Sequence, residues 1–178
     1  MVALCPSRSY DGQYHLVISD MTYETNTTNS EDTLRLGAII AKHLQGGETI
    51  ELASDLGGGK TTLVQGLAEA LGYEGRVTSP TFTLSNIYKI RDDLEIHHYD
   101  LYRLGEAGVV GQELAEDFGQ PEIVTIIEWA GVANHELPSD RLQIMIEVTG
   151  DTARNVKLVS SGPISAGLLE GAKHDLSA

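Results

Sequence analysis

The chain has 178 residues, 41% of them hydrophobic, which is enough for one folded domain with a full hydrophobic core. Its formal net charge is −14, and so acidic a protein is unsuited to bind a nucleic-acid backbone by itself. No apolar run approaches the roughly 18 residues that a membrane span needs, so we expect no membrane contact.

The first 20 residues lack the apolar segment and the small-residue cleavage site of a secretory signal peptide. The single cysteine, Cys5, cannot form an internal disulfide, which suits a reducing compartment. We therefore expect a cytoplasmic protein. Its predicted organisation is an N-terminal extension over residues 1–20, one domain over 21–160 and a C-terminal tail over 161–178.

The first part of the predicted domain reads as a helix, a strand, a glycine-rich loop and a second helix. Ser30 is a suitable N-cap residue with two acids directly after it, and apolar residues then recur at helical spacing as far as Gly46. Residues 48–53 are typical of a strand that leads into the loop. Residues 60–71 have the spacing of a helix, with Gly72 at its C-terminal end.

The rest of the domain is rich in strand patterns. Residues 122–129 are nearly all apolar, which is typical of a strand buried on both faces of a parallel sheet. The segments 141–148 and 155–160 alternate around a polar turn and predict a hairpin, and the tail after them reads as a frayed helix. This order predicts an α/β fold with a mostly parallel central sheet flanked by helices. Two more strands and a short helix are predicted over residues 81–90, 94–102 and 111–118.

The loop "SDLGGGKTT" (54–62) follows the phosphate-binding pattern G-x-x-x-x-G-K-[ST], the Walker A motif, except that Ser54 replaces the first glycine. Gly57–Gly59 allow backbone N–H groups to turn toward phosphates without a Cβ in the way. Lys60 can reach the β- and γ-phosphates, and Thr61 offers a hydroxyl to Mg²⁺ at the start of a helix. A serine at position 54 costs about 1 kcal/mol or less unless φ there is positive.

Two acids complete the predicted nucleotide site. A phosphate loop needs a carboxylate near the metal, generally at the end of a buried strand. Glu128 ends such a strand, and Asp100 ends another, although each could instead be a strand-end or edge carboxylate with a structural role. His97 and His98 point to opposite faces of a strand, so one is expected to pack or hydrogen-bond inside rather than both ligating a metal.

Other nucleotide-binding classes lack support in the sequence. The base-reading motif N-K-x-D of GTPases is absent, and no ABC signature follows the phosphate loop. A small-molecule kinase would need a lid that carries arginines, and no acceptor pocket can be recognised. Composition and spacing alone therefore indicate a small P-loop ATPase of unusual type.

Four stretches together resemble the TsaE (YjeE) ATPases, which support threonylcarbamoylation of tRNA. They are "SDLGGGKTTLVQGLAEALG" (54–72), "VTSPTFTLSNIY" (77–88), "HHYDLYRL" (97–104) and "IIEWA" (126–130). Their order and spacing match the family across residues 30–160. The resemblance implies a P-loop NTPase fold, ATP and Mg²⁺ as ligands, and slow hydrolysis.

The resemblance also implies roles for individual residues. Lys60 would hold phosphate, Thr61 and Glu128 would coordinate Mg²⁺, and Asp100 would position metal or water. Thr81 would face the γ-phosphate from a switch-like loop, unless its hydroxyl only caps a turn. The catalytic set is thus Lys60, Thr81, Asp100 and Glu128. The nucleotide-binding set is Asp55, Leu56, Gly57, Gly58, Gly59, Lys60, Thr61, Thr62, Ser30 and Arg154, with Ser30 near the adenine end.

The implied function is that of an ATP-hydrolysing accessory subunit for threonylcarbamoylation of tRNA adenosine 37. It would act on TsaD-like and TsaB-like proteins and meet tRNA only through them, while transfer chemistry lies on the TsaD-like protein. Residues 92–128 contain ten acids and one arginine, which is either a solvated face or a surface for a basic partner. A free-standing small-molecule kinase and a nucleotide-sensing binding module are the alternatives.

Overall fold

A computed structural model describes residues 6–8, 14–16, 21–104, 108–133 and 136–177. One sheet contains β3 (Thr22–Thr27), β4 (Thr49–Ser54), β5 (Ser85–Arg91), β6 (Leu94–Asp100), β7 (Ile123–Glu128), β8 (Leu142–Val148) and β9 (Arg154–Ser160). The helices are α1 (Ser30–Ala41), α2 (Lys60–Ala70), α3 (Gly108–Asp117) and α4 (Pro163–Leu176), with a short 3-10 helix, η1 (Ala130–Ala133). Within the predicted extension, β1 (Pro6–Arg8) and β2 (Tyr14–Leu16) pair antiparallel.

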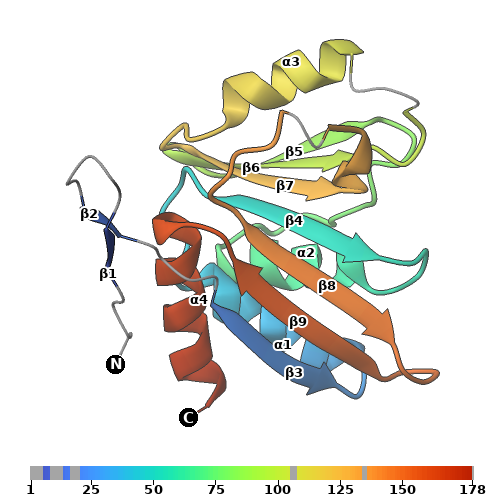
Figure 1. Cartoon of the computed structure of the whole chain (residues 1–178). Helices are drawn as coiled ribbons and strands as arrows, with labels where there is room; N and C mark the ends of the chain where they lie inside the picture. Colours follow the sequence, from blue (N-terminus) through green and yellow to red (C-terminus); the bar gives the residue numbers. More distant parts are fainter. Residues whose placement is uncertain (1–5, 9–13, 17–20, 105–107, 134–135, 178) are drawn as a thin grey trace.

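The seven strands lie in the order β3-β9-β8-β4-β7-β6-β5 (Figure 1). The three central pairings, β8 with β4, β4 with β7 and β7 with β6, are parallel. The three outer pairings, β3 with β9, β9 with β8 and β6 with β5, are antiparallel. The expected α/β class is confirmed, but the sheet is parallel only at its centre. On one side of the centre lies the β5–β6 hairpin, and on the other the β8–β9 hairpin with β3 added antiparallel at the edge.

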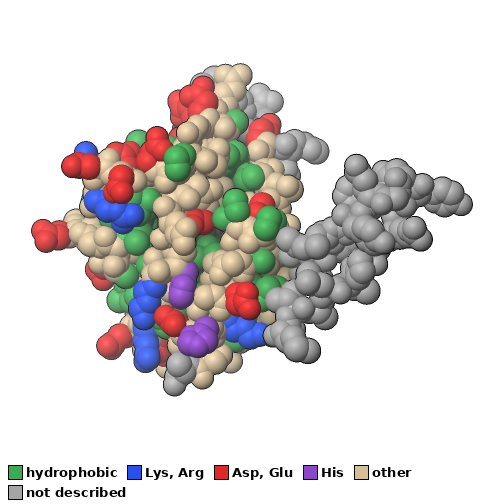
Figure 2. Space-filling model, turned by 90° about the vertical axis from the view of Figure 1, so that its left-hand side faces the viewer, with side chains coloured by type: hydrophobic (Ala, Val, Ile, Leu, Met, Phe, Trp, Pro, Cys, Tyr) green, Lys and Arg blue, Asp and Glu red, His purple; other side chains and the backbone are tan. Residues whose placement is uncertain are grey.

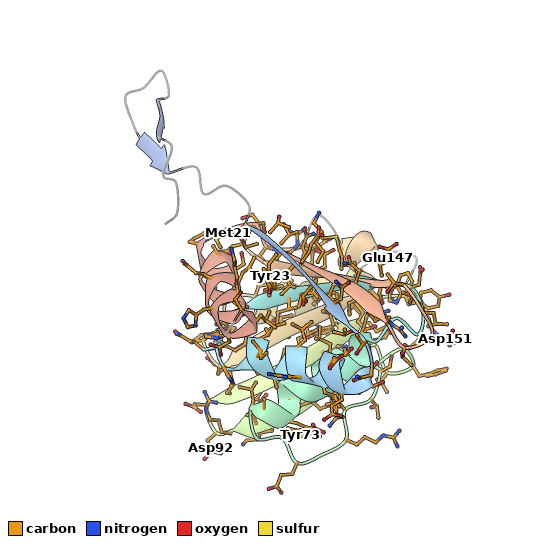
Figure 3. All side chains as sticks on the ribbon, turned by 90° about the horizontal axis from the view of Figure 1, so that it is seen from below. Met21, Tyr23, Tyr73, Asp92, Glu147 and Asp151 are labelled. Atoms are coloured by element: carbon orange, nitrogen blue, oxygen red, sulfur yellow. The ribbon has the colours of Figure 1, made fainter. Side chains whose placement is uncertain are left out.

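Helices cover both faces of the sheet. α1, α2 and α4 lie on one face and α3 on the other, and Figure 3 shows α1 and α2 side by side across their face. A Cβ on Gly37 of α1 would lie 2.3 Å from the carbonyl oxygen of Leu63, and one on Gly66 of α2 would lie 2.1 Å from that of Leu34. Only glycine permits this close approach, which holds the start of α2 firmly against α1.

Two expectations about helix ends are wrong. The N-cap of α1 is Asn29 rather than Ser30, because the side chain of Asn29 accepts the N–H of Asp32 at 2.8 Å. The segment 161–178 is not a frayed tail, since it contains α4, whose Leu168 and Leu169 are buried in the core. The Asp140 carboxylate accepts N–H groups in the first turn of α4, so this helix is part of the domain.

The surface shows no separation of charge on the side drawn in Figure 2. Acidic side chains are dispersed over that face with Lys and Arg side chains between them. No helix in the described ranges combines the length and apolar character needed to cross a membrane.

Candidate functional site

The glycine-rich loop joins β4 to α2 and has a backbone that requires glycine. Gly57 and Gly59 have φ values of 76° and 111°, which residues with a Cβ rarely adopt. A Cβ on Gly58 would lie 2.4 Å from the Ser54 hydroxyl. Among the described residues, positive φ outside glycine occurs at Leu84 and Trp129, so Ser54 carries no such strain. A serine therefore fits at the first motif position.

The N-terminus of α2 opens beside this loop. Gly59 is its N-cap, and no side chain in the described part of the chain caps that end. The free N–H groups and the helix dipole form a site for an anion. Lys60 is only 6% exposed, and its Nζ donates to the carbonyl oxygens of Ser54 and Asp55, each at 3.3 Å, and to the Ser54 hydroxyl at 3.2 Å.

Two buried carboxylates lie at the ends of neighbouring parallel strands, and one of them, Glu128, faces Lys60. Asp100 and Glu128 are the last residues of β6 and β7 and are paired directly in register. Each is 2% exposed, and Glu128 Oε2 lies 3.6 Å from Lys60 Nζ. The carboxyl ends of parallel strands meet at one edge of a sheet, where ligands commonly bind in α/β folds.

The segment before β5 closes over Asp100. The expected strand over 81–90 begins only at Ser85. A turn precedes it, in which the Pro80 carbonyl accepts the backbone N–H groups of Thr83 and Leu84, and Leu84 has a φ of 67°. The turn places the Thr81 hydroxyl against Asp100 Oδ2, with Ser79 Oγ 2.7 Å from Thr81 Oγ1. The backbone N–H of Tyr102 donates to Asp100 Oδ1 at 2.9 Å. Asp100 is thus held at both oxygens.

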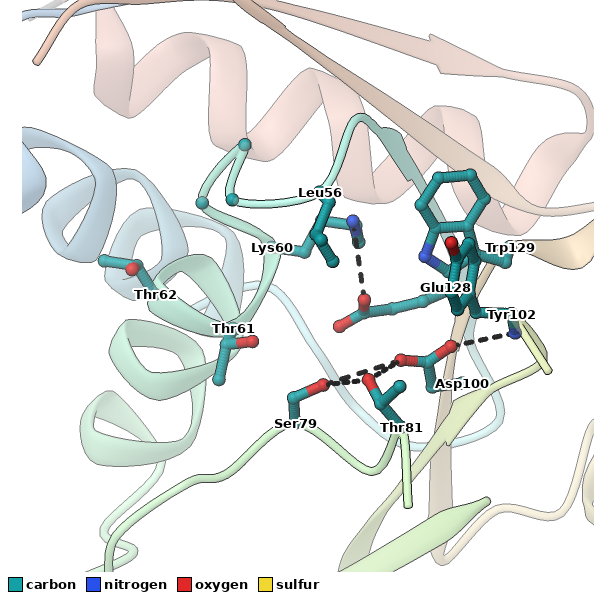
Figure 4. A pocket seen from close by; sticks show the side chains of 13 residues that line it. Leu56, Lys60, Thr61, Thr62, Ser79, Thr81, Asp100, Tyr102, Glu128 and Trp129 are labelled. Atoms are coloured by element: carbon teal, nitrogen blue, oxygen red, sulfur yellow. Dashed lines mark hydrogen bonds and ion pairs between the residues drawn. The ribbon is translucent and has the colours of Figure 1, made fainter. Parts of the chain in front are cut away.

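These groups surround one cavity of about 260 Å³. Figure 4 shows Lys60 and Glu128 pointing toward each other, with Ser79, Thr81 and Asp100 hydrogen-bonded beside them. All four predicted catalytic residues therefore meet in one place. The lining residues are Leu56, Gly57, Gly58, Gly59, Lys60, Thr61, Thr62, Ser79, Thr81, Asp100, Tyr102, Glu128 and Trp129.

A second cavity, of about 170 Å³, lies on the other side of the same loop. It brings together Ser30, expected near the adenine end of a nucleotide, and Arg154, expected near the nucleotide. Arg154 Nε donates to the Gly58 carbonyl at 2.9 Å and so braces the loop. Asp55 lines neither cavity. Its carbonyl instead accepts from Gly58 N and Lys60, so it shapes the loop through its backbone.

The residues of this cavity could hold a phosphate group and a divalent cation such as Mg²⁺. The positive-φ glycines and the uncapped start of α2 form a cradle for phosphate oxygens, with the Lys60 ammonium next to it. Thr61 and Glu128 line the same cavity, and hydroxyl and carboxylate oxygens are the ligands that Mg²⁺ prefers.

Three lining residues, Ser79, Tyr102 and Trp129, are absent from the predicted site, although all three lie in quoted motifs. Ser79 belongs to the S-P-T stretch and Tyr102 to D-L-Y-R-L, and their positions beside the predicted residues were the available signal. The Tyr102 ring lies 4.9 Å from that of Trp129, and Lys60 Nζ lies 4.9 Å above the Trp129 ring. Trp129 therefore faces the cavity rather than the core.

The opposite face of β6 carries a separate polar cluster under α3. His97 Nδ1 and the Tyr99 hydroxyl each lie 2.6 Å from Asp117 Oδ2. Burial, followed by the hydrogen bond to Asp117, raises the pKa of Tyr99 above its ordinary value. As expected, the two histidines of β6 point to opposite faces, and His98 Nε2 lies 2.9 Å from Glu128 Oε1.

The chain has a P-loop NTPase fold. A strand leads through the phosphate loop into a helix, and two acids lie at the ends of neighbouring parallel strands. A family model described as threonylcarbamoyl adenosine biosynthesis protein TsaE matches residues 27–156. The chain therefore belongs to the TsaE family, which confirms the resemblance seen in its motifs.

Individual relatives agree with this assignment. The chain is 36% identical over 141 residues to the tRNA threonylcarbamoyladenosine biosynthesis protein TsaE of Bacillus subtilis, covering 76% of this chain and 84% of that protein. It is 39% identical over 127 residues to the protein of the same name from Streptomyces coelicolor, covering 70% and 86%. A crystal structure of Bacillus subtilis YdiB matches with a TM-score of 0.70 and 30% identity, covering 88% of this chain and 98% of that one.

Proposed function

We propose that this chain is a Mg²⁺-dependent ATPase that binds ATP in the cavity between the phosphate loop and the ends of β6 and β7. The observation that carries the proposal is the convergence of Lys60, Asp100 and Glu128 at the uncapped N-terminus of α2. Positive charge, helix dipole and two acids in one cavity form the set that phosphoryl transfer from a nucleotide uses.

The proposed roles follow from what each side chain contacts. Lys60 would give up its contacts with Ser54 and Glu128 and bind phosphate oxygens instead. Thr61 and Glu128 would hold the metal ion. Bound Mg²⁺ supplies charge neutralisation at the phosphate oxygens. Asp100 is the other carboxylate that lines the cavity, and its two oxygens are fixed by Tyr102 N and the Thr81 hydroxyl. A carboxylate with a fixed orientation is suited to orient an attacking water and accept its proton.

We further propose that this ATPase serves threonylcarbamoyladenosine formation in tRNA, as the names of its relatives suggest. The proposed position is adenosine 37, and the proposed location is the cytoplasm. It would act on a TsaD-like and a TsaB-like protein, with the transfer reaction on the TsaD-like protein. A net charge of −14 supports contact with tRNA through these partners rather than directly. Asp100 and Glu128 are buried in the cavity, so the acidic run over 92–128 is not one continuous docking face.

Reconstitution from purified proteins tests this proposal. TsaD-like and TsaB-like proteins, tRNA and the threonylcarbamoyl donor are combined with ATP, and modified tRNA is counted per TsaD-like protein. We expect multiple turnovers with the wild-type chain and about one turnover without it. Equal turnover without this chain would contradict the proposal.

Two variants separate the proposed ATPase from its alternatives. Asp100→Asn should bind ATP but fail to support multiple turnovers, whereas Asp117→Asn, the same change under α3, should support them. A nucleotide-sensing module would tolerate Asp100→Asn. A small-molecule kinase would consume ATP in proportion to a phosphorylated metabolite, which a screen of metabolite extracts would detect.

A further inference from the structure

His98 lies on β6 directly behind the cavity and is fully buried. In the parallel register of β6 and β7, Asp100 is paired with Glu128 and His98 with Ile126. Because side chains alternate along a strand, His98 and Asp100 share the face that Glu128 occupies on the next strand. His98 Nε2 consequently reaches Glu128 Oε1 at 2.9 Å.

The two oxygens of Glu128 are divided between two partners. Oε1 faces His98, while Oε2 faces Lys60 at 3.6 Å on the cavity side. Since a carboxylate accepts hydrogen bonds and does not donate them, the ring nitrogen next to Oε1 carries the hydrogen. The His98 N–H therefore fixes one oxygen of Glu128 at the back and leaves the other to the cavity.

The other nitrogen of the His98 ring argues against a purely structural role. Nδ1 is buried and has no hydrogen-bond partner among the described residues. A buried polar atom without a partner is unfavourable, and an apolar side chain of similar volume would fill the space without that cost. The hydrogen bond to Glu128 is the interaction that distinguishes histidine from such a side chain here.

The neighbouring His97 shows the contrasting arrangement. Its Nδ1 lies 2.6 Å from Asp117 Oδ2 and its Nε2 lies 3.3 Å from Glu95 Oε2, so both nitrogens have partners. It lies on the α3 side of the sheet, away from the cavity. His97 therefore offers a matched control on the adjacent residue of the same strand.

We propose that His98 is a positioning residue that orients the Glu128 carboxylate for the metal of bound nucleotide. The inference rests on the proposed ATP site. When Lys60 turns from Glu128 to phosphate, the His98 N–H remains as the direct hydrogen bond to this carboxylate. His98 then contributes to the part of nucleotide affinity that depends on Mg²⁺, and not to the part that depends on the loop and Lys60.

Calorimetric titration of the full-length protein with ATP, in Mg²⁺ and in EDTA, tests this inference. The variants are His98→Leu, which removes the donor, His98→Gln, whose amide N–H lies near the position of Nε2, and His97→Leu as the control. Removing a group that orients a metal ligand weakens metal binding by roughly 10- to 100-fold. We expect His98→Leu to lose at least about tenfold in Mg²⁺ while its affinity in EDTA stays unchanged.

The controls separate positioning from folding. His98→Gln should recover most of the Mg²⁺-dependent affinity, and His97→Leu should retain all of it. Equal losses in Mg²⁺ and EDTA for His98→Leu, or no loss in either, would overturn the inference. Should His98→Leu not fold, His98→Asn, whose shorter amide does not reach Glu128, replaces it with the same expected result. Failure of the wild-type chain to bind ATP would instead refute the proposed function itself.

Discussion

The two faces of β6 carry similar groups, a histidine beside a carboxylate, in very different surroundings. On one face His98 and Glu128 adjoin a cavity lined by Lys60, whereas on the other His97 and Asp117 lie under α3. In the cluster under α3, the side chains bind one another: both nitrogens of His97 and the Tyr99 hydroxyl have carboxylate partners. The cluster at the cavity is open on one side, because Glu128 and its partner Lys60 line a cavity of about 260 Å³. Openness of this kind, rather than burial of charge alone, distinguishes a site for a ligand from a structural clamp.

Among the changes on the two faces of β6, Asp100→Asn on the cavity side should have the largest effect, a loss of ATP hydrolysis. Loss of a carboxylate that orients water and accepts its proton should lower the rate of ATP hydrolysis by roughly 10²- to 10⁴-fold. ATP affinity should change little, because the phosphate loop and Lys60 are intact. Phosphate release under single-turnover conditions measures the rate, and an unchanged rate would remove Asp100 from the proposed mechanism.

Asp117→Asn, on the α3 side, should lower stability and leave nucleotide binding unchanged. It weakens two hydrogen bonds between α3 and β6 and should lower the free energy of unfolding by about 2 kcal/mol. Denaturation with guanidinium chloride measures this loss, and calorimetry should find an unchanged affinity for ATP. A large loss of affinity with unchanged stability would show that the two faces are not independent.

Tyr99 makes the cluster under α3 sensitive to alkaline pH. The pKa of Tyr99 is raised in the folded protein, whereas the pKa of a tyrosine in the unfolded chain is about 10. Stability from this source is complete below that pH and falls as the pH rises above it, because the unfolded chain then releases a proton that the folded one retains. Tyr99→Phe should cost about 1 kcal/mol at neutral pH and reduce the alkaline loss. An identical alkaline decline in the variant would contradict this assignment.

Ser54→Gly should have the smallest effect. Ser54 lies in β4 without positive φ, so glycine relieves no strain there. The change removes one of the groups that hold Lys60 away from phosphate, and ATP affinity should stay within about threefold of wild type or improve. Calorimetry decides this point, and a severe loss of affinity would assign the serine a role in binding.

The parts of the site that were predictable lie in local motifs. The loop, Lys60 and Thr61 follow from consecutive residues, while Asp100 and Glu128 follow from strand ends that parallel pairing brings together. The hydrogen bond between His98 and Glu128 was not predictable, because it depends on the register of two strands and on which face each side chain occupies. Sequence spacing alone contains neither quantity.

The fold shows the same division between local and tertiary information. β4, which leads into the phosphate loop, and its neighbour β7 have strong apolar patterns and were predicted. β3 (Thr22–Thr27) is polar and largely exposed, and its pairing with β9 defines it as a strand. α4 contains two glycines and was expected to fray, but packing of Leu168, Leu169 and Ala172 in the core stabilises it.

The central claim is that the cavity beside the phosphate loop binds ATP through Lys60. Titration of the wild-type chain and of Lys60→Ala with ATP and Mg²⁺ in a calorimeter tests it most directly. We expect one ATP per wild-type chain and an affinity about 100-fold lower in the variant, since charge-assisted bonds to phosphate are worth about 3 kcal/mol together. Equal affinities of the two proteins, or no binding by the wild type, would contradict the account.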